Sequence, residues 1–407
     1  MAVDVGTISG ILKRVYSPEK IEDQQNRQYM TWSKIKKAPG RPAGLGFFGS
    51  VLLSGNQEGL GSQNELESLR QSGSQRAQQY VITPKILTDT IQFSGLSLEV
   101  AKSNDEAFAN NLTFQMEESM TDAFKELNGQ LFRDGQGVIA RVAVAAAPGA
   151  TVLTFDSVQY IKQNMLIDIF DAATNTVLEL SGDQIVDINI VTNQVTVATP
   201  IPVALALNDF VYRTRVHTGA PTDGKELAGL RLAVDDGTIS ATYESIPRTG
   251  VGAQPNWRGI VVNAGGVNLS NDLLQRTIMR MKVAGSAEPD MLVAHPQQTR
   301  KYLDVVTPLK RFDKTGNLDS GYTKLEWNGR PWMEDTDCPT NSVYYINTNY
   351  FRKYEVRGLA LDDQNGQVLK WNPGFDGFIA YLKYYGNLGS QRPSNLARLE
   401  NLVVPTF

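Results

Sequence analysis

The chain has 407 residues, of which 41% are hydrophobic and 20% charged, a balance that is typical of a folded globular protein and excludes a disordered or collagen-like chain. Its net charge of −4 gives no overall preference for nucleic acid or for an anionic membrane. The single cysteine, Cys338, excludes an internal disulfide framework and an all-cysteine metal site, and indicates a reducing compartment.

Two further features of the sequence bear on location. No apolar run approaches the ~20 residues that a membrane-spanning helix needs. The first twenty residues, MAVDVGTISGILKRVYSPEK, lack the apolar core and basic flank of a signal peptide. We therefore expect the protein to be made and kept in the cytosol, with no membrane partner.

The first 41 residues form a locally basic segment, in which eight Lys and Arg residues face four Asp and Glu residues for a net charge of +4. A basic, weakly periodic arm could lie along a neighbouring subunit or near a polyanion. A solvated terminus is the other interpretation, and the sequence leaves both open.

Residues 43–92 are rich in Gly, Ser and Gln. Two more apolar stretches, GLGFFGSVLLSG and RAQQYVITPKIL, enclose a polar tip, which predicts a long two-stranded ribbon. Because an isolated two-stranded ribbon is marginally stable in water, this one needs a partner. Gly44, Gly46 and Gly49 match G-x-G-x-x-G, but no strand precedes them and no helix follows. They indicate a flexible root of the ribbon and not a phosphate site.

The longest helical signal covers residues 103–135. Ser103 and Glu106 form a capping box at its start, and Gly135 is a stop signal. At about 1.5 Å per residue the helix would be a rod of roughly 45 Å, either an ordinary core helix or a beam covered on one side. Apolar residues recur at three- and four-residue spacing along one face: Phe108, Leu112, Met116, Met120, Phe124, Leu127 and Leu131.

Residues 141–218 change to short alternating runs separated by turn signals, which predict a small antiparallel barrel or sandwich. One of these turns is SGD at residues 181–183. Seven acidic and four basic residues give the segment a net charge of −3. The six candidate strands are TVLTF, NMLIDIFD, NTVLEL, QIVDINIV, QVTVAT and FVYRTR.

The remainder of the chain interleaves helices and strands without a strict βαβ rhythm, which favours an α+β fold. We expect a helix over residues 268–285 with Ser270 as its N-cap. A buried strand is expected at residues 289–296, a hairpin turn at residues 328–329 (Asn-Gly), and a long strand at residues 374–386.

No catalytic constellation appears in the sequence. His217 and His295 are the only histidines and fall in different predicted units, without H-E-x-x-H or C-x-x-C. Cys338 is better explained as a structural thiol than as a nucleophile. Neither G-x-S-x-G nor a Walker A sequence occurs. We predict no catalytic, cofactor-binding or metal-binding residue, and expect a non-enzymatic chain that contacts copies of itself.

The order of these elements resembles the major capsid proteins of tailed bacteriophages, which have the Hong Kong ninety-seven type of shell fold. The resemblance covers nearly the whole chain except the acidic β insert. It rests on six short motifs in sequence: YVITPKIL at residues 80–87, FRDG at 132–135, MLVAHP at 291–296, WNGRP at 327–331, SVYYIN at 342–347 and RPSNLA at 392–397.

This resemblance implies an α+β phage capsid fold in which the spine helix, residues 103–135, packs its apolar stripe on residues 378–385. We further expect the β insert to project from the outer surface. The implied parts are an N-terminal arm at 1–42, an extended loop at 43–92, a peripheral domain at 93–140 and 362–391, an inserted all-β domain at 141–218, and an axial domain at 219–361 and 392–407.

The resemblance also implies a function. Hexamers and pentamers would form the icosahedral shell of a virion, assembled in the host cytoplasm, with scaffolding, portal and decoration proteins as partners and sequence-independent contact with packaged double-stranded DNA. No cofactor is expected. The candidate subunit-interface residues lie in the ribbon, the arm and the loop at 362–377: Phe47, Phe48, Leu52, Leu53, Tyr80, Val81, Lys34, Lys36, Lys37, Arg41, Asn365 and Trp371.

Some members of the family cross-link a lysine of the extended loop to an asparagine of the peripheral loop. Here no lysine lies between Lys37 and Lys85. Asn365 and Asn372 are therefore not cross-link candidates, and the sequence predicts a non-covalent shell. Two alternatives remain: the shell protein of an encapsulating compartment with the same fold, and, from a different class, an enzyme with an unrecognised site.

Overall fold

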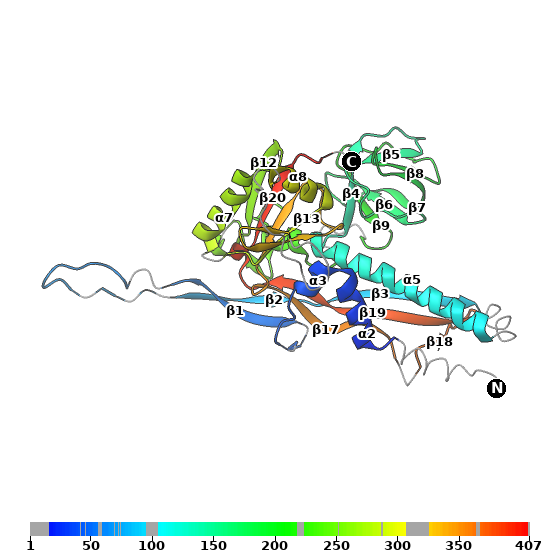
Figure 1. Cartoon of the computed structure of the whole chain (residues 1–407), viewed down its shortest axis with the longest axis horizontal. Helices are drawn as coiled ribbons and strands as arrows, with labels where there is room; N and C mark the ends of the chain where they lie inside the picture. The colour runs from blue at the N-terminus through cyan, green and yellow to red at the C-terminus, as the bar shows by residue number, and fades with distance from the viewer. Residues whose placement is uncertain are drawn as a thin grey trace. The chain divides into compact units, whose positions relative to one another are not determined.

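The computed structural model describes residues 16–405 except 41, 45, 56–58, 69, 72, 74, 95–104, 218–223, 251, 286–287, 307–324 and 364–366. Contacts within the chain divide it into two compact units (Figure 1). Unit 1 comprises Met1–Gln28, Lys85–Gly229 and Arg357–Tyr385. Unit 2 comprises Tyr29–Pro84, Leu230–Val356 and Gly386–Phe407. Both units are discontinuous in sequence.

The long helix of unit 1, α5, spans Asp105–Phe132. The described part of its predicted stripe is buried, from Met116 through Leu131. Ser103 of the predicted capping box lies outside the described residues, as do the side chains of Phe108 and Leu112. The helix stops before Gly135, which has a φ of +80° that side-chain-bearing residues rarely adopt. The sequence therefore predicted this helix to within three residues at each end.

A four-stranded sheet accompanies α5. Its order is β17-β19-β18, with β3 also paired to β19, and α5 lies against β3. The strands are β3 (Lys85–Ser94), β17 (Phe351–Leu361), β18 (Lys370–Trp371) and β19 (Gly377–Ser390). The short helix α2 (Pro18–Gln28) precedes them in the chain.

A closed barrel forms the second part of unit 1, in the order β4-β5-β8-β7-β6-β9. The first and last strands pair through Val138 and Tyr212, so the chain enters and leaves the barrel at neighbouring points. A separate apolar core fills it. The strands are β4 (Val138–Val144), β5 (Val152–Phe155), β6 (Leu166–Phe170), β7 (Leu178–Asn189), β8 (Gln194–Val197) and β9 (Phe210–Arg213).

The barrel differs from the predicted strands in two respects. Its first strand, β4, starts at Val138, before the expected start of the insert at residue 141. The predicted turn at residues 181–183 lies inside β7, where an extra residue forms a β-bulge opposite β6. Gly182, with a φ of +60°, makes this bulge possible, and its N–H donates to the carboxylate of Asp168 (2.7 Å). Two predicted strands are thus one.

Unit 2 is built on a six-stranded sheet in the order β12-β20-β16-β13-β15-β14. The predicted helix is α7 (Asn271–Gly285), which lies against β12 and β20. Its N-cap is confirmed, because Ser270 Oγ accepts the Leu273 N–H (3.3 Å). The strands are β12 (Ile260–Val267), β13 (Met291–Ala294), β14 (Glu326–Trp327), β15 (Arg330–Glu334), β16 (Val343–Ile346) and β20 (Ala397–Leu402). The short helix α6 (Leu230–Ala233) precedes β12 in the chain, and α8 (Pro296–Val306) follows β13.

The turn between β14 and β15 is the predicted hairpin turn. Asn328 and Gly329 have φ values of +50° and +72°, the left-handed conformation at both central positions that a two-residue hairpin requires. The strand β13 is buried along its whole length, as the apolar run MLVA predicts.

The ribbon of unit 2 consists of β1 (Phe47–Ser54) and β2 (Arg76–Ile82). They pair antiparallel, with Phe47 opposite Ile82. The expected ribbon extended to residue 92, but Thr83 and Pro84 separate β2 from β3, and β3 belongs to the sheet of unit 1. Pro84 lacks the N–H that a continuous ladder requires.

Candidate assembly surfaces

The inner face of the ribbon is anchored in unit 2. Phe47 packs edge-on against Tyr354 at 5.3 Å between ring centroids, and Tyr80 stacks on Trp257 at 6.0 Å. The backbone carbonyl of Leu53 accepts a hydrogen bond from the Asn256 amide (2.8 Å). Three of the predicted interface residues, Phe47, Leu53 and Tyr80, are therefore buried within their own chain.

The outer face of the ribbon exposes two large apolar side chains. Phe48 and Leu52 are 49% and 56% exposed, and they point to the same side because side chains alternate along a strand. Val81 and Ala77 lie opposite them on β2. An interface role for Phe48, Leu52 and the half-buried Val81 stays a prediction. Alternation along the strand explains why their neighbours are buried instead.

The root of the ribbon is held by a buried carboxyl group. The Glu244 backbone carbonyl accepts the Val81 N–H (3.1 Å), and its carboxylate accepts the Ser390 N–H (3.0 Å). Glu244 and Ser245 both have positive φ, in the tight turn between β10 (Thr242–Tyr243) and β11 (Ile246–Pro247). Burial raises the pKa of Glu244 to about 8.

The basic residues that follow α3 (Met30–Lys34) make contacts within unit 2. Lys36 donates to the Asn349 side-chain oxygen (2.8 Å), and Lys37 lies 3.2 Å from the Glu355 carboxylate. Lys34 is exposed, and Arg41 lies outside the described residues. Of the four basic candidates for an intersubunit contact, two already have partners in their own chain.

The predicted peripheral loop carries two exposed aromatic residues, Trp371 and Phe375. Trp371 is 58% exposed and packs edge-on against Phe378 at 5.4 Å. Asn365 lies outside the described residues. Behind Trp371, the Asp362 carboxylate accepts hydrogen bonds from Lys370 (2.7 Å) and Lys383 (2.9 Å), which hold its pKa well below the usual range. The loop is thus tied to the sheet by charge.

The groups that could support chemistry occupy structural positions. His217 stacks on Tyr212 at 4.4 Å, and a ring nitrogen lies 3.0 Å from the Asn175 carbonyl oxygen. Burial lowers the pKa of His295 to about 4. Burial, followed by the nearby Asp335, raises the pKa of the Cys338 thiol well above its usual value, which leaves it unreactive.

Among the described residues, no group of three or more His, Cys, Asp or Glu side chains is placed to hold a metal ion. None of the described helices combines the length and the apolar character that a membrane-spanning segment requires.

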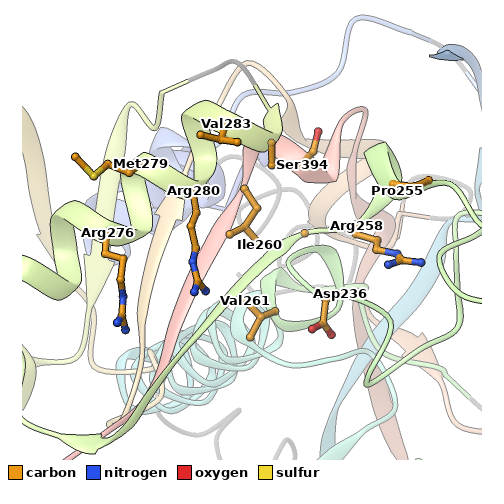
Figure 2. A pocket seen from close by; sticks show the side chains of 12 residues that line it. Asp236, Pro255, Arg258, Ile260, Val261, Arg276, Met279, Arg280, Val283 and Ser394 are labelled. Carbon is orange, nitrogen blue, oxygen red and sulfur yellow. The ribbon is translucent and has the colours of Figure 1, made fainter.

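One surface was missed by the sequence analysis. Unit 2 has a groove of about 540 Å³ between α7 and the segment that leads into β12. Figure 2 shows the side chains that line it. Arg276, Met279, Arg280 and Val283 of α7 line it. The signal was present in the sequence, because Met279 and Val283 fall on the helix face opposite its buried residues.

A long helix lying against a sheet, a discontinuous second unit and a projecting ribbon together define the fold of tailed-phage capsid proteins, the Hong Kong ninety-seven type. The chain is similar to the capsid asymmetric unit of Cyanophage A-1(L), with a TM-score of 0.54 and 10% identity over 91% of this chain and 90% of that one.

Two further solved structures are similar at lower scores. A structure of Gordonia phage Cozz gives a TM-score of 0.45 and 11% identity over 92% of this chain and 86% of that one. The virus-like particle from Pyrococcus furiosus gives a TM-score of 0.38 and 9% identity over 95% of this chain and 98% of that one. No family model and no curated protein matches the sequence.

Proposed function

We propose that this chain is the major capsid protein of a tailed double-stranded DNA phage, and that its hexamers and pentamers form the icosahedral shell of the virion. The observation that carries the proposal is the similarity in fold, over 91% of the chain, to the capsid subunit of Cyanophage A-1(L). The function is structural, without a catalytic step.

The assembly mechanism relies on many weak contacts of defined geometry. The exposed outer face of the ribbon, with Phe48 and Leu52, supports a contact to an adjacent subunit. Each contact can be modest because a closed shell repeats it many times. The exposed Lys34, and Arg41, are proposed for a neighbouring subunit or for packaged DNA, where binding is independent of sequence and weakens with salt.

Electron microscopy of the full-length protein tests the proposal. We expect closed shells or ring-shaped capsomers when the chain is expressed with its candidate scaffolding protein, and sedimentation of these species far ahead of the monomer. A chain that stays monomeric with and without the co-expressed head proteins contradicts the proposal.

The contents of the particles separate a virion from an encapsulating compartment of the same fold. A virion protects double-stranded DNA from added nuclease, whereas a compartment contains protein cargo. Genes for terminase, portal and tail proteins next to this gene would also favour the virion. The portal, scaffolding and decoration proteins are proposed partners on the same basis.

We further propose the barrel as the outer accessory domain of the shell. Its chain entry and exit are adjacent, so it can be added to the fold without disturbing it. Several apolar residues on its surface are exposed, among them Ile190 and Val191 at 68% and 88%. Such a surface suits contacts between capsomers or a decoration protein.

A further inference from the structure

The groove on α7 combines apolar walls with unpaired positive charge. Met279 and Val283 are 57% and 87% exposed along its rim. Arg276 and Arg280, one helical turn apart, extend side by side over it (Figure 2). Among the described residues, neither guanidinium has a hydrogen-bond or ion-pair partner. An apolar groove with two free guanidinium groups fits an acidic segment that presents an apolar side chain.

The tip of the ribbon has this chemistry. Leu66 is 101% exposed and is flanked by Glu65 and Glu67. Its φ of +68° is in the left-handed region, which a leucine rarely adopts. An apolar side chain held in a strained backbone and turned fully into water points to a binding role.

Hydrogen bonds close a turn at the tip. Glu67 accepts the Asn64 N–H (2.8 Å), and the Gln63 amide donates to the Ser68 carbonyl (2.6 Å). These bonds close a tight turn and leave Leu66 at its apex. A preformed turn loses little conformational entropy on binding, which favours association.

We propose that the groove on α7 binds the ribbon tip of a second copy of this chain, with Leu66 between Met279 and Val283 and with Glu65 and Glu67 facing Arg276 and Arg280. The contact joins two different surfaces of the chain. Repeated head to tail, such a contact generates a ring, which is the arrangement that a hexamer or pentamer needs. The inference rests on the proposed shell function and assigns one of its contacts.

A charge exchange tests the contact. The tip variant is Glu65→Lys, which leaves the bond from the Asn64 N–H to Glu67 in place, and the groove variant is Arg276→Glu. Both side chains are exposed, so the folded subunit should keep its unfolding midpoint. Each variant alone should lower the yield of assembled shells about tenfold or more, because like charges meet across the contact. The combined exchange should restore the yield.

Lys282→Glu provides the matched control. Lys282 lies on the same helix outside the groove and is half-exposed, in a surface ion pair with Glu288 (2.6 Å). Its reversal should leave the shell yield unchanged. If the unaltered chain and both reversed variants all form shells, this inference is overturned while the proposed function stands. If the unaltered chain forms no shells, the proposed function itself has failed. If each variant alone lowers the shell yield and the combined variant does not restore it, the inference is also overturned.

A disulfide between copies gives an independent readout. Leu66→Cys combined with Val283→Cys should form linked chains on oxidation, seen as a ladder on a non-reducing gel. The native Cys338 is buried and should not react. Leu66→Cys with Leu303→Cys, on the exposed side of α8, is the control pair. Equal ladders from both pairs, or none from the first in assembled shells, contradict the contact.

Discussion

At the scale of single residues, unit 1 contains a buried arginine that pairs with two carboxylates. Arg133 is 5% exposed and lies 2.9 Å from the Glu126 carboxylate and 2.7 Å from that of Glu226. Its guanidinium also lies over the ring of Tyr160 at 4.8 Å. Burial opposes the charge, but the two carboxylates outweigh it and raise the pKa of Arg133. The cluster joins the end of α5 to the segment after the barrel.

Replacing Arg133 with leucine should lower the free energy of unfolding by about 3–5 kcal/mol, since two buried carboxylates would lose their common partner. Urea unfolding of the unassembled subunit measures the change. Arg213→Leu is the control, because Arg213 is half-exposed and 3.9 Å from Glu126, where a loss of no more than ~1 kcal/mol is expected. Equal losses from both substitutions would refute the importance of burial.

Glu244 makes the stability of unit 2 depend on pH. Burial raises its pKa from 4.5 to about 8, so the folded state binds a proton that the unfolded state releases. This contribution is complete below pH 4.5, declines as the pH rises and is lost above about pH 8. The loss has a slope of about 1.4 kcal/mol per pH unit where only the folded state is protonated.

Glu244→Gln should flatten this dependence, because glutamine keeps the acceptor for the Ser390 N–H and carries no charge. Glu226, whose pKa burial raises to about 7, titrates in both proteins alike, so the difference between their curves reports Glu244. We therefore expect wild type to lose stability from pH 7 to 8 and the variant to lose much less. The midpoint of urea unfolding, measured from pH 5 to 9, checks this. Parallel curves for the two proteins would contradict it.

At the scale of elements, the barrel is the part most independent of the rest. It has its own core, and its terminal strands β4 and β9 pair with each other. Residues 136–216, excised and expressed alone, should therefore fold cooperatively. Far-ultraviolet circular dichroism and a single urea transition measure this. An excised barrel that is unfolded, or that binds dyes as a collapsed state does, would show that it depends on unit 1.

Elements with local signals were predictable from sequence, and those decided by distant contacts were not. The helix α5, the Ser270 cap and the Asn328-Gly329 turn each follow from residues within a few positions of one another. The bulge at Gly182 was read as a turn, since its Asp168 partner lies fourteen residues away. The placement of β3 beside β19 depends on residues about 290 positions apart, for which one sequence carries no signal.

The same limit applies to the candidate surfaces. The sequence analysis assigned the apolar residues of β1 alike to the interface. Which of its two faces is covered depends on Tyr354 and Trp257, which come from distant parts of the chain. Phe48 and Leu52 therefore remain interface candidates, while Phe47 and Tyr80 form the core. The groove on α7 needed the structure, because Ile260 and Arg258 complete it from outside the helix.

At the scale of the whole molecule, the sequence predicts how the proposed shell is held together. A covalent cross-link between subunits needs a nucleophile at the ribbon tip, and no lysine lies between Lys37 and Lys85. Lys85 itself lies outside the ribbon, in β3, and contacts the carbonyl oxygen of Gly224. Burial lowers the pKa of Lys85, but its amino group is already bonded to Gly224 within unit 1.

Assembled particles, boiled in sodium dodecyl sulfate with reducing agent, should therefore run as a single band at the 44.8 kDa of one chain, unless a protease has trimmed it. The shell should also dissociate cooperatively over a narrow range of guanidinium concentration, because every contact is reversible and the loss of one weakens its neighbours. Ladders of linked chains from unaltered particles would show that another nucleophile acts, and would overturn the view of a shell held by weak repeated contacts.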